Sequence, residues 1–173
     1  MKQKAWKIEI DDVRLSEVCE AYFKWKDVNT YISRVSSRAL NMPDAISEPI
    51  GCYCLNLLWS RGNQPGDASD SNNKVTEFKA TSNFNQDLSS FGPKEEFDNL
   101  VFLRFDLSRD KVFIYELGLN SQDLGNYSVN SRETIQDQRQ QGRRPRISIL
   151  NKIIIPNNMQ PDMIFDIRKE KII

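Results

Sequence analysis

Residues 65–81 read Pro65-Gly66-Asp67-Ala68-Ser69-Asp70-Ser71-Asn72-Asn73-Lys74-Val75-Thr76-Glu77-Phe78-Lys79-Ala80-Thr81. Asp67 follows a Pro-Gly turn, and the polar run after it predicts a tight connection between two strands. The second half alternates as a strand does, so Glu77 and Lys79, two positions apart, are expected on one face. Asp67 would stand at the end of the partner strand and reach the same point across the hairpin.

These residue types are those of a magnesium site. The carboxylates of Asp67 and Glu77 and the carbonyl of Phe78 are hard oxygen ligands, which Mg²⁺ takes together with several waters. Lys79 is then free to hold or deprotonate an attacking water. The combination predicts metal-dependent hydrolysis of a phosphodiester bond. Asp70 is the alternative to Asp67, although the spacing favours Asp67, and the bare pattern also fits an ordinary polar hairpin.

Length and composition fit one globular domain spanning residues 1–173. The 24 basic and 24 acidic residues cancel, and histidine is absent. The lack of histidine excludes Ser-His-Asp triads, histidine zinc sites and histidine-dependent nucleases. Acid–base chemistry in this chain must therefore come from carboxylates, lysine or metal-bound water.

Neither a membrane span nor a signal-peptide core is recognisable, which favours a cytoplasmic protein that does not contact membranes. Cys19, Cys52 and Cys54 form an odd set without the spacing of a zinc site. They are expected to be buried free thiols.

A basic segment lies near the end of the chain. Residues 131–152 hold six basic and two acidic side chains, a local charge of +4. A basic flank beside an acidic centre is typical of a metal-dependent enzyme that acts on a polyanion. Solubility alone is the other interpretation of these arginines.

The hydrophobic pattern predicts helices first and strands afterwards. Residues 11–41 have helical spacing, and a second, largely apolar helix is expected to begin at Ser47, with Glu48 and Pro49 in its first turn. Its apolar positions extend to Trp59, before a turn over residues 61–66. This order predicts an α+β protein with a central mixed sheet flanked by helices.

The remaining segments are predicted as follows. A polar, amide-rich loop is expected over residues 80–93, followed by two strands at 99–106 and 111–117 that a hairpin at 107–110 joins. A short helix or turn is expected over 119–130, an arginine-rich loop over 131–146 and a strand over 147–155. The tail at 156–173 is amphipathic and gives no clear prediction.

The order and spacing of these residues resemble those of the PD-(D/E)XK nucleases, and most closely those of the PvuII-like type II restriction endonucleases. The match runs from Gly66-Asp67-Ala68 to Glu77-Phe78-Lys79, then through the strands at 101–103 and 111–116 and an arginine-rich loop entering Pro145-x-Ile147. It covers residues 47–155 in the same order with similar gaps. The resemblance implies a restriction-endonuclease-like fold with a catalytic and DNA-recognition core over 47–155 and a helical dimerisation subregion over 1–45.

The resemblance also implies a site and its partners. Asp67 and Glu77 would bind Mg²⁺ together with the Phe78 carbonyl, Lys79 would be the catalytic lysine, and Glu48 would be an accessory acid. The protein would be a homodimer that cuts double-stranded DNA at a short palindrome, leaving 5′-phosphate ends, while a cognate DNA methyltransferase protects host sites. Within that resemblance, the small enzymes that cut GC-N-GC are the implied subgroup, which the short length and the composition also fit.

The PvuII-like enzymes read bases with histidines, which this chain lacks, so base reading would pass to amides, hydroxyls or arginines. The side chains expected on DNA are Asn83, Asn85, Gln86, Ser89, Ser90, Arg139, Arg143, Arg144 and Arg146. The arginines suit either guanine edges or phosphates. Two alternatives to a restriction enzyme remain at this stage: another nuclease of this superfamily, such as a repair enzyme or junction resolvase, and a non-catalytic DNA-binding or toxin-neutralising module.

Overall fold

A computed structural model describes residues 6–61 and 65–173. Its centre is an eight-stranded sheet in the order β1-β2-β3-β4-β6-β7-β9-β10. The strands are β1 (Lys7–Ile8), β2 (Leu58–Ser60), β3 (Ala68–Ser69), β4 (Val75–Thr81), β6 (Asn99–Asp106), β7 (Lys111–Glu116), β9 (Met163–Asp166) and β10 (Lys171–Ile172). Part of the expected turn at 61–66, residues 62–64, lies outside the described residues, as do residues 1–5.

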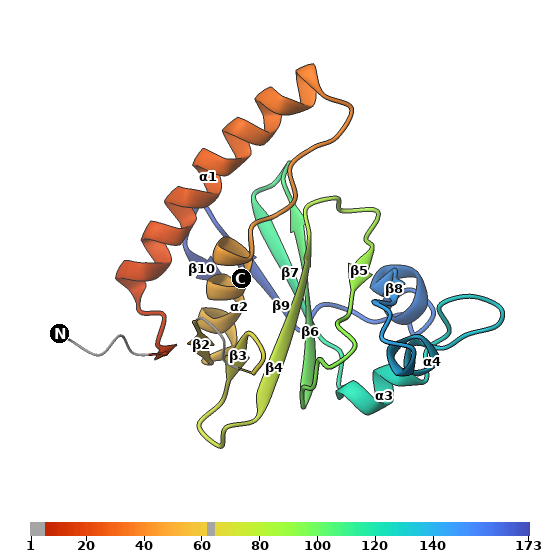
Figure 1. Cartoon of the computed structure of the whole chain (residues 1–173). Coiled ribbons are helices and arrows are strands. Elements are labelled where there is room, and N and C mark those ends of the chain that lie inside the picture. Colours follow the sequence, from red (N-terminus) through yellow and green to blue (C-terminus); the bar gives the residue numbers. More distant parts are fainter. Residues whose placement is uncertain (1–5, 62–64) are drawn as a thin grey trace.

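The sheet is mixed. Strands β4 and β6 pair in parallel, with Phe78 opposite Val101, whereas every other neighbouring pair is antiparallel. The predicted hairpin of β6 and β7 is confirmed, and so is the α+β class with a mixed sheet between helices (Figure 1). Helices α1 (Asp12–Val35) and α2 (Asp44–Leu55) lie on one side of the sheet, and α3 (Ser121–Gly125) and α4 (Ile135–Gln140) lie on the other.

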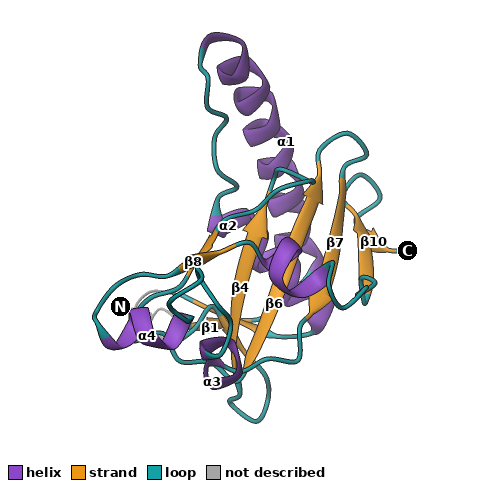
Figure 2. Cartoon of the chain, turned by 90° about the vertical axis from the view of Figure 1, so that its right-hand side faces the viewer, coloured by secondary structure: helices purple, strands orange, loops and turns teal. Residues whose placement is uncertain are grey.

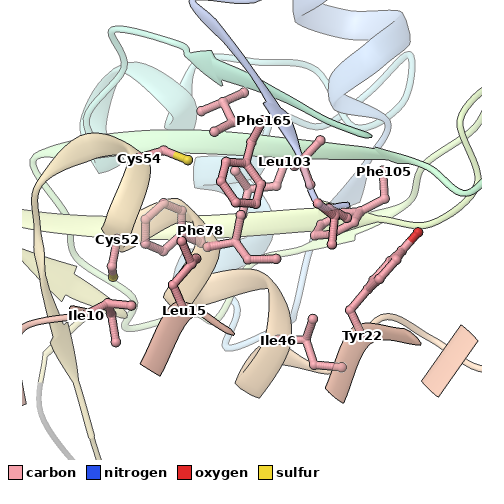
Figure 3. Close-up of a cluster of buried hydrophobic side chains, with 14 of the residues drawn as sticks. Ile10, Leu15, Tyr22, Ile46, Cys52, Cys54, Phe78, Leu103, Phe105 and Phe165 are labelled. Carbon is pink, nitrogen blue, oxygen red and sulfur yellow. The ribbon is translucent and has the colours of Figure 1, made fainter. Parts of the chain in front are cut away.

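The first side holds a hydrophobic cluster between the sheet and α1 and α2 (Figure 3). Phe78 enters this cluster from β4. A Cβ on Gly51 of α2 would lie 2.6 Å from Cε1 of Phe78, so only glycine lets the helix come this close to the strand. Cys19, Cys52 and Cys54 are buried here as free thiols, as expected.

A second hydrophobic cluster covers the opposite face of the sheet and includes Phe91, Phe102 and Leu150. The π-helical turn η1 (Leu150–Ile154) contributes to it, and a small sheet of β5 (Ser89–Ser90) and β8 (Arg146–Ile147) lies on the same side (Figure 1). Because side chains alternate across β4, Glu77 and Lys79 face this side while Phe78 faces the other.

Two helix boundaries differ from the prediction. The first helix ends at Val35 rather than continuing to 41, and Figure 2 shows its far end extending beyond the sheet. The second begins at Asp44 with Pro43 as N-cap, so Ser47 is not the cap and Pro49 lies inside the helix. Pro43 presets an extended backbone at the entry to the helix, and the apolar face already starts at Ile46, so the helix begins before Ser47, four residues later, could cap it.

The second helix also stops early. Asn56 takes a left-handed conformation with φ 53°, which ends α2 at Leu55. Leu58 and Trp59, expected in the helix, therefore belong to β2, between β1 and β3. An apolar run alone does not separate a buried helix from a strand.

The predicted strand at 147–155 is wrong beyond Ile147. Asp87 accepts hydrogen bonds from the backbone N–H groups of Ile149 and Leu150 at 2.7 and 3.1 Å, and from the Ser148 hydroxyl at 2.6 Å. This distant carboxylate caps the start of a helical segment, so the β-branched run coils instead of extending. The arginine-rich loop likewise contains a helix, α4, which a Thr134–Asp137 capping box begins.

Candidate active site

Strand β4 brings an acid and a lysine together. Lys79 Nζ lies 2.5 Å from Glu77 Oε1, which confirms that the two side chains share a face. Both are largely buried, with side-chain exposures of 16% and 7%. The same Lys79 ammonium lies 5.0 Å from the centre of the Phe91 ring. Burial of an ion pair is costly unless partners surround it, so this pair is typical of a functional site rather than of a stabilising one.

The backbone fixes Asp67 against the same strand. Its N–H donates to the Thr76 carbonyl at 3.0 Å, and its Oδ2 accepts from the Phe78 N–H at 2.7 Å. A residue's N–H and C=O point to the same edge of a strand, so the Phe78 carbonyl also faces this edge. Gly66 makes the approach possible: its φ is +65°, and a Cβ there would lie 2.2 Å from Cγ1 of Val75.

An open hollow of about 490 Å³ collects the acidic side chains of this region, because Glu48, Asp67, Glu77 and Glu95 all line it. Glu48 reaches the hollow from α2, where the indole N–H of Trp59 donates to its carboxylate at 2.7 Å. Sequence patterns missed Glu95, which lies on an irregular loop without any periodicity.

Burial has the largest effect on the pKa values of Glu48, Asp67 and Glu77. Burial, with the nearby Asp67 carboxylate, raises the pKa of Glu48 to about 8. Burial also raises the pKa values of Asp67 and Glu77, against the stabilising effects of the Phe78 N–H and of Lys79 respectively. For Lys79, burial favours the neutral amine, but the carboxylates of Glu77 and Glu95 outweigh it and raise the pKa.

These donors fit a hard divalent cation. The raised pKa values mean that the buried carboxylates are poorly stabilised in their charged form. A divalent cation would stabilise that form more than one lysine does. Within residues 6–61 and 65–173, no three acidic, histidine or cysteine side chains converge as a complete metal cage. Mg²⁺ needs no such cage, because it keeps several waters beside one or two carboxylates.

Asp70, the alternative to Asp67, lies elsewhere. Its Oδ1 accepts from the backbone N–H groups of Asn72 and Lys74, both at 2.8 Å, so it organises the turn between β3 and β4. The arrangement brings together Asp67, Glu77, Lys79 and Glu48 and leaves Asp70 out.

The amide-rich loop after β4 stays a loop up to β5. Asn83, Asn85 and Gln86 are exposed on it. The Thr81 hydroxyl holds the base of the loop by donating to the Gln86 carbonyl at 2.9 Å and accepting from the Asn83 N–H at 3.2 Å. Ser89 and Ser90 form β5 and pair with β8, where Ser89 is buried.

The four predicted arginines divide into two groups. Arg139 donates to the carbonyls of Gly92, Ser121 and Glu95, so its guanidinium is engaged inside the protein. Arg143 pairs with Glu133 but remains about half exposed. Arg144 and Arg146 are exposed, and neither forms an ion pair with the described part of the chain.

Comparison with known proteins adds an independent result. A family model described as Bsp6I restriction endonuclease matches residues 10–156. The type II restriction enzyme Bsp6I of Bacillus sp. (strain RFL6) is 40% identical over 167 residues, which cover 96% of this chain and 95% of that enzyme. No solved structure matches the chain. None of the helices in the described residues is long and apolar enough to span a membrane.

Proposed function

This chain belongs to the Bsp6I restriction endonuclease family, and from that premise we propose that Asp67, Glu77 and Lys79 form its catalytic centre. It is a type II restriction endonuclease, that is, a sequence-specific deoxyribonuclease whose substrate is DNA. The observation that carries the assignment is the convergence of buried Glu77, half-buried Asp67 and largely buried Lys79 at β4. A histidine-free chain has few other side chains able to perform the hydrolysis.

Asp67, Glu77 and the Phe78 carbonyl would hold Mg²⁺, with Glu48 as an accessory acid. When bound, the metal would supply Lewis-acid stabilisation of the scissile phosphate and lower the pKa of a water. Lys79 keeps its proton because its pKa is raised, so it orients the water or the phosphate by donating hydrogen bonds. Hydrolysis at the 3′ oxygen leaves 5′-phosphate ends.

The fold that supports this site best is that of the PD-(D/E)XK nucleases. The acid before β3, the Glu-Phe-Lys strand and the acid on the preceding helix occur in the order of that superfamily, within a mixed sheet flanked by helices.

Two surfaces beside the site would contact DNA. The exposed amides of Asn83, Asn85 and Gln86 suit base edges, whereas exposed Arg143, Arg144 and Arg146 suit either guanines or phosphates. Ser89 and Ser90 are mostly engaged in β5 and would act by placing the loop. Arg139 would act in the same way, because its donors already have partners.

A homodimer would match a palindromic site such as GC-N-GC, since a two-fold DNA sequence fits a two-fold protein. Residues 1–45 supply a candidate dimer surface: Val28, Tyr31 and Val35 form one exposed apolar stripe on the projecting part of α1 (Figure 2). A cognate DNA methyltransferase would protect the host's own sites, and the bacterial cytoplasm, where that DNA lies, is the proposed location.

Digestion of a sequenced plasmid tests the proposal. With Mg²⁺ the protein should yield discrete fragments whose mapped ends define one short palindrome, and Asp67→Ala should yield none while still binding DNA. Cutting of branched DNA alone would favour a junction resolvase, and the absence of Mg²⁺-dependent cleavage on all substrates would favour a non-catalytic DNA-binding module. Normal cleavage by Asp67→Ala would refute the site.

A further inference from the structure

Glu95 supplies a second carboxylate beside the Lys79 ammonium, in addition to that of Glu77. Its Oε1 is 3.6 Å from Lys79 Nζ, and its side chain is only 22% exposed. The other carboxylate oxygen, Oε2, accepts from the backbone N–H of Gly92 at 3.1 Å. The Glu95 carboxylate is therefore held by its own turn while it faces the lysine.

Arg139 locks that turn from the arginine-rich segment. Its Nε donates to the Gly92 carbonyl at 3.0 Å, and its Nη2 donates to the Glu95 carbonyl. A third bond, from Nη1 to the Ser121 carbonyl at 3.3 Å, ties the same guanidinium to the start of α3. A guanidinium presents its donors in a rigid plane, so three such bonds fix the position of the turn closely.

The same short stretch reaches Lys79 a second time. The Phe91 ring lies beneath the ammonium, and the Phe91 N–H donates to the Pro145 carbonyl at 3.0 Å. Ser90 pairs with Arg146 between β5 and β8. Residues 89–95 therefore carry both Phe91 and Glu95, the two residues of this stretch that contact Lys79. Main-chain bonds and the Arg139 guanidinium connect the same stretch to the arginine-rich segment.

We propose that Glu95 is a positioning residue for Lys79, and that Arg139 fixes the 92–95 turn so that Glu95 can hold the ammonium in place. The inference rests on the proposed function of Lys79. With Glu77 and Glu95 both beside its ammonium, the long, flexible side chain of Lys79 is restrained before substrate arrives. This restraint reduces the entropy lost in reaching the reactive arrangement. Glu95 acts through Lys79 and does not itself contact the reacting atoms.

Three measurements on Glu95→Gln test this role: single-turnover cleavage with Mg²⁺, DNA affinity with Ca²⁺ in place of Mg²⁺, and thermal unfolding without metal. Glutamine keeps the size of the side chain and removes its charge. We expect the cleavage rate constant to fall by about 10- to 100-fold, because a misplaced catalytic group costs rates of that order. DNA affinity, the Mg²⁺ concentration for half-maximal rate and the folded state should stay as in the wild type.

Glu96→Gln is the matched control, because Glu96 is the exposed neighbour and forms no ion pair within the described residues. It should leave the rate constant unchanged. Arg139→Lys keeps the positive charge but breaks the planar set of bonds, so it should lower the rate in the same way. Combined with Glu95→Gln, it should add little further loss, since both changes release the same lysine.

The outcomes separate the two proposals. If Lys79→Ala abolishes cleavage while Glu95→Gln cuts at the wild-type rate, the positioning role is overturned and the catalytic centre stands. A raised Mg²⁺ requirement in Glu95→Gln would also overturn it, because Glu95 would then be a metal ligand. Normal cleavage by Lys79→Ala would refute both the centre and the inference.

Discussion

Asp67 Oδ2 accepts a 2.7 Å hydrogen bond from the backbone N–H of Phe78, the residue between Glu77 and Lys79. The carboxylate on one strand of the hairpin is therefore fixed to the main chain of the other. Because a main-chain donor holds it, the Asp67 carboxylate keeps its place beside β4 without the help of a second side chain. The proposed catalytic centre is in this sense preorganised by the hairpin.

Replacement of Asp67 by Asn should remove cleavage while leaving the hairpin intact. Asparagine still accepts the Phe78 N–H but has lost the charge that would hold Mg²⁺, so we expect a loss of about 100-fold or more in cleavage rate. Asp70→Asn is the matched control, because its contacts lie within the turn. Timed plasmid digestion measures the cleavage rate of both variants. Equal losses of rate in the two would contradict the assignment of Asp67.

Gly66→Ala should destabilise the protein by about 3 kcal/mol, because it adds a clash to backbone strain. The new Cβ would lie 2.2 Å from Cγ1 of Val75 at a position with φ +65°. Gly142 is the control: its φ is +70°, but a Cβ there would meet nothing within 4 Å. Gly142→Ala should therefore cost only about 1 kcal/mol from strain. Urea unfolding measures both, and equal costs would mean that the hairpin yields to the clash.

Features of this fold and site are predictable from the sequence when the residues that determine them lie close together along the chain. Glu77 and Lys79 were predictable because the two-residue period of a strand is local, and Asp67 because a short hairpin is nearly so. Glu95 was missed because its place beside Lys79 depends on Arg139, 44 residues further along. These tertiary contacts leave no periodic signal in the sequence.

The misassigned segments have the same cause. Residues 147–155 are apolar and β-branched, which favours a strand, but Asp87 caps their backbone from 62 residues away at Ile149. The tail at 156–173 gave no clear pattern and forms two short strands, β9 and β10, at the edge of the sheet. β9 is specified by pairing with β7, which no local pattern encodes.

Asp110 should be the most sensitive acid for stability outside the proposed centre. It is buried and accepts from Tyr22 Oη at 2.9 Å, while Lys26 and Arg168 each approach it to 2.5 Å. Asp110→Asn keeps its left-handed backbone, since asparagine tolerates φ 53°, but leaves the cations without their anion. We expect a loss of about 3 kcal/mol at pH 7 by urea unfolding.

The loss of stability in Asp110→Asn should be present at neutral pH and disappear in acid. Burial raises the pKa of Asp110, but bonds from Lys26, Tyr22 and Arg168 outweigh it and lower the pKa overall. Its contribution is therefore complete above the ordinary carboxyl range and is lost as the pH falls below it. Wild type and Asp110→Asn should converge in stability in acid. Glu20→Gln, which breaks an exposed pair with Lys24, is the control and should change little at any pH.

Glu48 should give the metal-free protein the opposite pH dependence, with a free energy of unfolding that falls as the pH rises. Burial raises its pKa from 4.5 to about 8, so between these values the folded protein holds a proton that the unfolded chain releases. Stability in EDTA should therefore fall as the pH rises through this window. Glu48→Gln cannot titrate, yet it can still accept the Trp59 N–H. It should match the wild type near pH 5 and exceed it by about 2 kcal/mol at pH 8, because each pKa unit is worth about 1.4 kcal/mol and partial exposure screens some of the effect.

Mg²⁺ should change this comparison, because a cation held by Asp67 and Glu77 also relieves the repulsion on Glu48. Added Mg²⁺ should raise the wild-type midpoint of thermal unfolding more at pH 8 than at pH 6, since fewer protons then have to leave these acids. Exposed Glu116→Gln should behave as the wild type throughout. A Mg²⁺ effect that is the same at both pH values, or that persists in Asp67→Asn, would mean that the cation binds away from these acids.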